Sequence, residues 1–133
     1  MSKPYILLLE DDRWLADSYA VSIESADHEV VVTDSAQSAI DIVDEYGAPR
    51  ALVADVMLAG GTVFSLLNEM GSYEDTKHIP VILNTSVDVG QFHQQYLDSY
   101  GVIGVLDKAK STPNKLIEMI KICLVSRDGM VAR

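Results

Sequence analysis

The pattern of apolar and polar positions divides the chain into short apolar runs that alternate with longer segments of mixed polarity. Short apolar runs occupy residues 5–9, 29–33, 50–54, 79–84 and 102–107. Compact, partly β-branched runs of this length are typical of strands buried on both faces of a parallel sheet. Pro80, near the start of the fourth run, fits a strand end, where no ladder donor is needed. The pattern therefore predicts five strands.

The segments between these runs have apolar residues at helical spacing and residues that start or stop helices. Asp12, Ser35 and the Thr112–Pro113 pair are expected to cap the first, second and fifth helices. A polar helix is expected over residues 89–100. Five strands alternating with five helices predict an α/β fold, with a parallel sheet covered by helices on both faces.

The length of 133 residues favours one domain with a core of its own. We expect this domain to span residues 1–125. Residues 126–133 show no helical or strand periodicity, and we expect a flexible tail there.

Composition excludes several classes of partner. Ten basic and twenty acidic residues give a net charge of −10, which disfavours direct binding to nucleic acid or to an anionic membrane. No apolar run approaches the roughly 20 residues that a membrane span needs. The single cysteine, Cys123, excludes an internal disulfide. We expect a cytoplasmic protein, with Cys123 filling core space on a helix.

Chemistry-bearing residues follow four of the five predicted strands. These residues are Glu10 and Asp11, Asp55, Thr85, and Lys108. Parallel strands bring such ends to one edge of the sheet, which is where ligands bind in open α/β folds. Clustered carboxylates repel one another unless a cation lies between them, and Mg²⁺ suits such oxygen ligands. The set supports transfer of a phosphoryl group to Asp55, with Lys108 and Thr85 contacting phosphoryl oxygens.

Four stretches, ILLLEDD, LVADVML, IPVILNTS and VIGVLDK, occur in an order and spacing that resemble the receiver domain of two-component response regulators. The resemblance covers residues 4–124. It implies a flavodoxin-like fold with strand order 2-1-3-4-5. It also implies that Asp55 is the phosphoacceptor, Thr85 the switch hydroxyl and Lys108 the lysine of the family pattern.

The resemblance further implies a metal site and partners. Glu10, Asp11, Asp55 and the backbone carbonyl of Met57 would hold Mg²⁺, Glu10 through water. A histidine kinase or phosphotransfer protein would supply the phosphoryl group. An unidentified downstream protein would bind the face formed by the fourth helix, the fifth strand and the fifth helix. Such a domain accepts phosphate and can release it, but it is not a dedicated enzyme.

Four positions depart from the family pattern. Ala59 and Val63 replace a usual Pro and Gly after the acceptor, Val105 replaces an aromatic switch residue, and Ala109 replaces a proline that follows the lysine in a cis bond. A cis bond before a residue other than proline costs about 2.5–4 kcal/mol. We therefore expect a trans bond or a local rearrangement at Ala109. Val105 leaves it open how phosphorylation would reach a distant face.

Three alternatives belong to other functional classes. A binding-only pseudo-receiver would keep the fold without control by phosphorylation. A haloacid-dehalogenase-like phosphatase needs a second Asp two residues after the nucleophile, where this chain has Met57. A flavin carrier needs a phosphate-binding loop after the first strand, where this chain has Glu10, Asp11 and Asp12.

Overall fold

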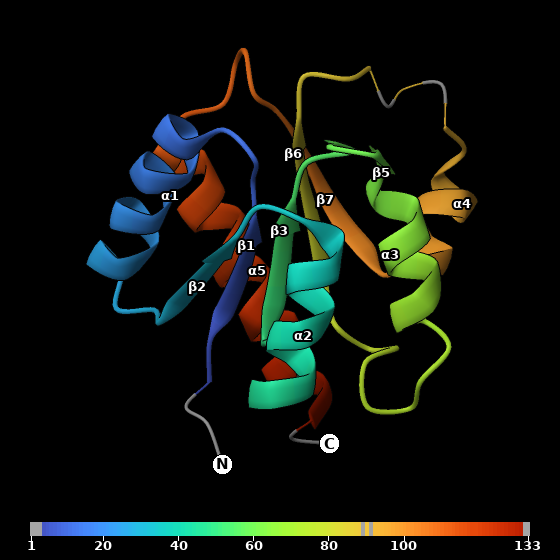
Figure 1. Cartoon of the computed structure of the whole chain (residues 1–133). Helices are drawn as coiled ribbons and strands as arrows, with labels where there is room; N and C mark the ends of the chain where they lie inside the picture. The colour runs from blue at the N-terminus through green and yellow to red at the C-terminus, as the bar shows by residue number, and fades with distance from the viewer. Residues whose placement is uncertain (1–3, 89, 91, 132–133) are drawn as a thin grey trace.

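The computed structural model describes residues 4–131, except 89 and 91, with side chains described as far as residue 125. The five predicted strands are β1 (Ile6–Leu9), β2 (Val30–Thr33), β3 (Ala51–Ala54), β6 (Val81–Thr85) and β7 (Val102–Asp107). The five helices are α1 (Arg13–Ser25), α2 (Ala36–Tyr46), α3 (Val63–Met70), α4 (Gln94–Ser99) and α5 (Pro113–Val131). Figure 1 shows the strands running through the centre, with the helices around them.

All five strands are parallel and lie in the order β2-β1-β3-β6-β7. Counted along this sheet alone, that is the expected 2-1-3-4-5 order, so the predicted fold class is confirmed. Leu9 pairs with both Thr33 and Ala54, and Thr85 pairs with Asp107. The ends of all five strands therefore lie at one edge of the sheet.

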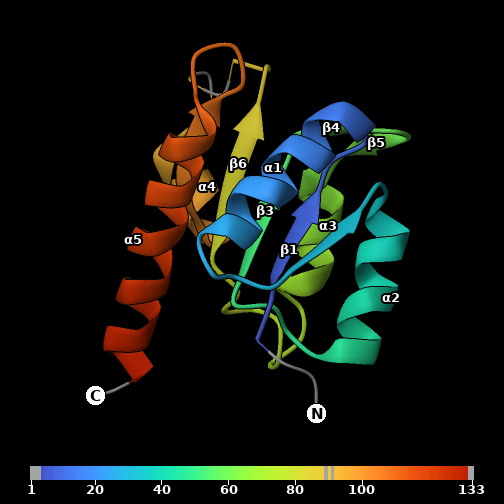
Figure 2. The same ribbon diagram turned by 90° about the vertical axis from the view of Figure 1, so that its left-hand side faces the viewer.

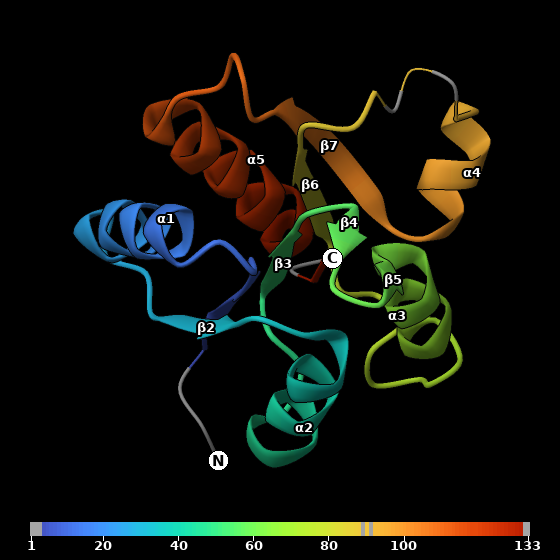
Figure 3. The same cartoon turned by 45° about the horizontal axis from the view of Figure 1, so that its top comes forward.

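Helices cover both faces of the sheet, as the strict alternation predicted. Figure 3 shows α1 and α5 on one face, with α2, α3 and α4 on the other. Side chains of β1 alternate between the two faces: Ile6 and Leu8 pack toward α1 and α5, and Leu7 and Leu9 pack toward α2 and α3. All four are at most 1% exposed, which explains why this strand is apolar at every position.

The predicted helix starts are confirmed by hydrogen bonds. Asp12 accepts from the backbone N–H groups of Trp14 and Leu15, and Ser35 accepts from that of Ser38. Thr112 accepts from the N–H of Lys115 in the first turn of α5. Each cap satisfies amide donors that a helix leaves unpaired at its start. Cys123 is buried in the core on α5, as expected.

Three features differ from the sequence-based expectations. Residues 57–62, expected as a loop before α3, form a small antiparallel hairpin of β4 (Met57–Leu58) and β5 (Gly61–Thr62). The fourth helix, expected over 89–100, spans only Gln94–Ser99. Residues 126–131, expected in a loose tail, continue α5 to Val131 (Figure 2). A helix that is already nucleated adds residues at little cost, so absent periodicity did not end it. The flexibility of the tail stays a prediction.

Candidate functional site

One ammonium group joins the two acidic strand ends. The Nζ atom of Lys108 lies 2.5 Å from Oε1 of Glu10 and 2.7 Å from Oδ2 of Asp55. These three residues follow β1, β3 and β7, so the sheet topology alone brings them to the same edge, at the top of Figure 1. The predicted convergence of Glu10, Asp55 and Lys108 is present in the structure.

Burial strengthens the electrostatics of this cluster. The side chains of Glu10, Lys108 and Asp55 are 2%, 10% and 13% exposed. Burial alone lowers the pKa of Lys108, but its hydrogen bonds and charge interactions with Asp55 and Glu10 outweigh that effect. The net result is a pKa above the ordinary lysine value. Lys108 is therefore a fixed positive charge beside Asp55 at neutral pH.

Thr85 lies at the same edge and is almost fully buried, with 1% exposure. Its carbonyl oxygen accepts the backbone N–H of Lys108, which fixes the start of the loop that carries the ammonium group. Its hydroxyl oxygen accepts the N–H of Val87 at 3.1 Å. The hydroxyl therefore already orders the loop after β6, and any new partner for it would compete with or add to that bond.

Asp11 and Met57 lie at the edge of the cluster. The Asp11 side chain is exposed, and Met57 contributes its backbone N–H to Oδ1 of Asp55 while its side chain is 51% exposed. Among the residues that the structure describes, no three His, Cys, Asp or Glu side chains are grouped closely enough for a metal ion. The structure thus brings together Glu10 and Asp55 around Lys108, and the role of Asp11 as a metal ligand stays a prediction.

The donor chemistry of this pair fits Mg²⁺. Glu10 and Asp55 are carboxylates already arranged around one positive charge, and Mg²⁺ is usually held by one or two carboxylates with several waters. Three protein carboxylates are therefore not required. The second oxygen of Glu10 accepts the N–H of Asp12 at 3.1 Å, which holds this side chain toward the cluster.

Asp107 has a role that the sequence analysis missed. Its carboxylate accepts the backbone N–H of Ala109 at 2.9 Å, and its carbonyl accepts those of Lys110 and Ser111. The Lys108–Ala109 bond is trans, as predicted. A proline at position 109 would have no N–H to donate to Asp107. This turn therefore depends on Ala109 standing where the family pattern has proline. The sequence signal for this turn was Asp107 two residues before Ala109, because an Asp side chain can accept the N–H of the second residue after it.

The family comparison matches this geometry. The sequence pattern described as response regulator receiver domain matches residues 6–121, which is most of the chain. The chain belongs to the response regulator receiver domain family. A two-component response regulator from rice, Oryza sativa subsp. japonica, is 28% identical over 100 residues, covering 74% of this chain and 81% of the rice protein.

Solved structures show that the fold of this receiver domain is shared widely. A CheY-like receiver domain from Methanospirillum hungatei superposes with a TM-score of 0.84 at 19% identity, covering 97% of this chain and 99% of the other. The receiver domain of a Pseudomonas aeruginosa sensor histidine kinase has a TM-score of 0.77 at 18% identity, with coverage of 92% and 98%. That crystal structure has a magnesium ion coordinated in its active site cleft.

The departures from the family pattern have visible structural counterparts. Val105, at the usual aromatic position, is partly buried against the core beside α2, α3 and α4. Aromatic rings are instead clustered between α3 and α4, where Phe64 lies 5.3 to 5.6 Å from the ring centroids of Phe92, Tyr96 and Tyr100. This receiver domain therefore anchors α4 with rings that do not come from β7.

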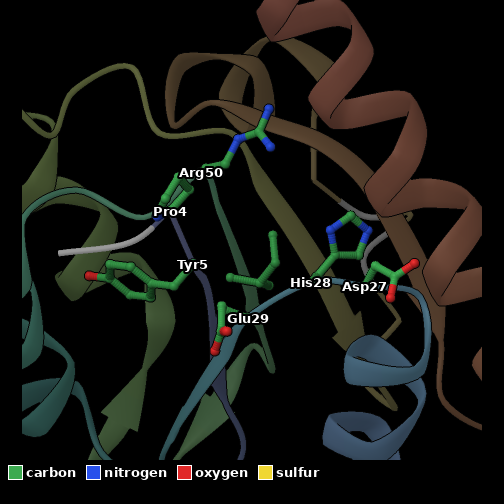
Figure 4. Close-up of a pocket in the computed structure, with 7 residues that line it drawn as sticks. Pro4, Tyr5, Asp27, His28, Glu29 and Arg50 are labelled. Carbon is green, nitrogen blue, oxygen red and sulfur yellow. The ribbon is translucent and has the colours of Figure 1, made fainter.

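A separate cavity of about 270 Å³ lies at the opposite edge of the sheet (Figure 4). Figure 4 shows His28 and Asp27 on one side of it, with Arg50 and Pro4 on the other. His28 is only partly exposed. Because these residues precede β1, β2 and β3 rather than follow them, this cavity is not part of the Asp55 cluster.

No helix among the described residues has both the length and the apolar character that crossing a membrane requires.

Proposed function

We propose that this receiver domain is switched by phosphorylation of Asp55. The observation that carries the proposal is the bridge from Lys108 to both Asp55 and Glu10, because it places a buried, permanently charged ammonium beside the acceptor. A carboxylate in that position can act as a nucleophile toward phosphorus. The negative charge that develops on the phosphoryl oxygens then has a fixed positive charge beside it. The donor would be a histidine kinase or a phosphotransfer protein.

The transfer forms one bond and breaks one bond at phosphorus. A carboxylate oxygen of Asp55 bonds to phosphorus as the bond from phosphorus to the donor nitrogen breaks, and the freed imidazole takes a proton from solvent. Lys108 then releases its contact to Asp55 and donates to a phosphoryl oxygen. Thr85 donates its hydroxyl hydrogen to another phosphoryl oxygen, while its oxygen can still accept the N–H of Val87.

Glu10, Asp55, the carbonyl of Met57 and the exposed Asp11 would hold Mg²⁺. The ion would neutralise charge between the acceptor and the incoming phosphoryl oxygens. Glu10 contributes the most buried carboxylate of the set, held by the N–H of Asp12. Asp11 would join by rotation of its exposed side chain, and its substitution by Asn should weaken Mg²⁺ binding without unfolding the protein.

Incubation with acetyl phosphate and Mg²⁺, followed by intact mass measurement, tests this function. We expect the mass to increase by one phosphoryl group in the wild type and not in Asp55→Asn. Glu74→Gln is a matched control, because Glu74 is an exposed acid that pairs with Lys77 at the surface, and this variant should be modified like the wild type. No modification of the wild type by any phosphoryl donor would instead support a binding-only pseudo-receiver.

Output would occur at the face formed by α4, β7 and α5. Thr85 and Lys108 would couple the site to this face. Thr85 pairs with Asp107 on β7 and precedes the loop to α4, and Lys108 directly follows β7. We expect beryllofluoride, a phosphoryl mimic, to change backbone NMR shifts of residues 86–88 and of α4. A response confined to residues next to Asp55 would contradict coupling to this face.

A further inference from the structure

A second concave site lies between the ends of α2 and α3. The cavity has a volume of about 430 Å³, and its apolar surface includes Ala39, Ile40 and Val43 of α2 with Leu66 and Met70 of α3. Of the residues in α2, only Ala39 is fully buried, so the apolar face of this helix is incompletely covered by α3. Because the cavity includes Gly47 and Thr76, it lies near the edge of the sheet opposite Asp55.

Carboxylates surround this apolar floor on both sides. Asp44 lies on α2, Glu69 on α3, and Asp75 on the segment that follows α3; all three line the cavity and are exposed. Within the part of the chain that the structure describes, none of their side chains has a hydrogen-bond or ion-pair partner. The molecule has a net charge of −10, so the chain as a whole does not offset this acidity.

An aromatic residue completes the rim. Tyr73 lines the same cavity and is 58% exposed, so its ring is available to a cationic side chain. Thr76, which also lines the cavity, donates its hydroxyl hydrogen to the carbonyl of Met70 at 2.5 Å, which fixes the turn after α3. The rim is therefore held on a defined backbone.

We propose that this groove binds a basic amphipathic segment of a partner protein, with one aliphatic side chain in the cavity and Lys or Arg residues at the rim. Charge complementarity selects the basic residues, since Asp44, Glu69 and Asp75 line the groove from α2, from α3 and from the segment after α3. Exposed carboxylates bind a free small cation weakly, because water screens them. An aliphatic anchor supplies the apolar burial that small cations lack.

A synthetic amphipathic helix of Leu and Lys is a suitable probe. We expect saturable binding, with backbone NMR shifts concentrated in α2, α3 and residues 71–76. The triple variant Asp44→Asn/Glu69→Gln/Asp75→Asn should weaken binding by about tenfold or more. A matched triple variant, Asp17→Asn/Glu24→Gln/Glu118→Gln, removes the same charge from exposed positions elsewhere and should change affinity less than about twofold.

The apolar part of the proposal has its own variant. Val43→Phe adds an apolar ring to a partly exposed wall of the cavity and leaves every rim charge in place. It should weaken binding of the Leu–Lys helix while leaving phosphorylation by acetyl phosphate unchanged, which separates this site from the function of Asp55.

Four results would overturn the proposal. Equal weakening by the two triple variants would show binding to net charge alone. NMR shifts centred on residues 10–12 would place the probe at the acidic strand ends. Equal affinity for free hexylamine would make the occupant a small amine. Concentration-dependent dimerisation of the wild type that Val43→Phe abolishes would make the occupant a second copy of this chain.

Discussion

At the scale of single residues, one side chain compensates for the missing proline. Asp107 holds the turn after β7 by accepting the N–H of Ala109. Thr85 holds the start of the same turn through the N–H of Lys108. The backbone that carries the Lys108 side chain is thus held by hydrogen bonds from two consecutive N–H groups, those of Lys108 and Ala109.

Asp107→Ala should therefore destabilise this turn by about 1 kcal/mol, the usual net value of one hydrogen bond. It should also slow phosphorylation of Asp55 by acetyl phosphate, because Lys108 loses part of its support. Asp107→Asn keeps an acceptor oxygen and is the control. Urea unfolding and the rate of mass gain check both effects, and equal behaviour of the Ala and Asn variants would contradict the role of the turn.

Tyr5 gives the structure a pH-dependent residue far from Asp55. Its hydroxyl donates to the carbonyl of Gly47 at 2.6 Å, and burial raises its pKa from 10.0 to about 12. Because the folded state keeps this proton more tightly than the unfolded state, the associated stability is complete below pH 10. It is lost as the pH rises toward 12.

Tyr5→Phe should remove this dependence. Near pH 8 the variant should be less stable by about 1 kcal/mol, since one hydrogen bond is lost. Between pH 10 and 12 the wild type should lose stability relative to the variant, so the difference narrows. Urea unfolding of both proteins across this range gives the comparison, and a constant difference would show that Tyr5 does not titrate as described.

At the scale of elements, the sequence predicted those with strong periodicity and missed those set by local geometry. The β7 bounds and the cap residues of α1, α2 and α5 were predicted correctly, because apolar runs and cap residues are local signals. The hairpin of β4 and β5 was missed because two-residue strands have no periodicity. Gly60, with a φ of 91°, makes its turn, and glycine alone in a sequence does not distinguish a hairpin from a loop.

The cap of α1 can be tested without disturbing the core. Asp12→Ala should lower the free energy of unfolding by about 1 kcal/mol, because the N–H groups of Trp14 and Leu15 lose their acceptor. Asp11→Ala removes the same charge one residue earlier and caps nothing in the structure. With EDTA present, the two variants should differ in urea unfolding; equal losses would mean that charge rather than capping is measured.

At the scale of the whole molecule, the topology explains how distant residues form one cluster. Glu10, Asp55 and Lys108 meet because β1, β3 and β7 are parallel strands of one sheet, and the strand-end pattern predicted this meeting. Whether the exposed carboxylate of Asp11 turns toward this cluster was not predictable, because side-chain orientation at an exposed edge has no sequence signal. The same holds for the groove between α2 and α3, which depends on how two helices pack.

Mg²⁺ should stabilise the folded molecule. A ligand that binds only the folded state at about ten times its Kd adds about 1.4 kcal/mol to the free energy of unfolding. We expect a higher melting temperature in Mg²⁺ than in Na⁺ at matched ionic strength, and a smaller increase in Asp55→Asn. Identical increases in the two proteins would exclude Asp55 as a ligand.

The most direct measurement locates the phosphoryl group on the chain. The protein is incubated with acetyl phosphate and Mg²⁺, reduced with borohydride, which converts an acyl phosphate to an alcohol, and digested for peptide mass spectrometry. Our account predicts homoserine at position 55 and at no other acidic residue. Reduction at Asp11, at Asp12 or nowhere in the chain would contradict it.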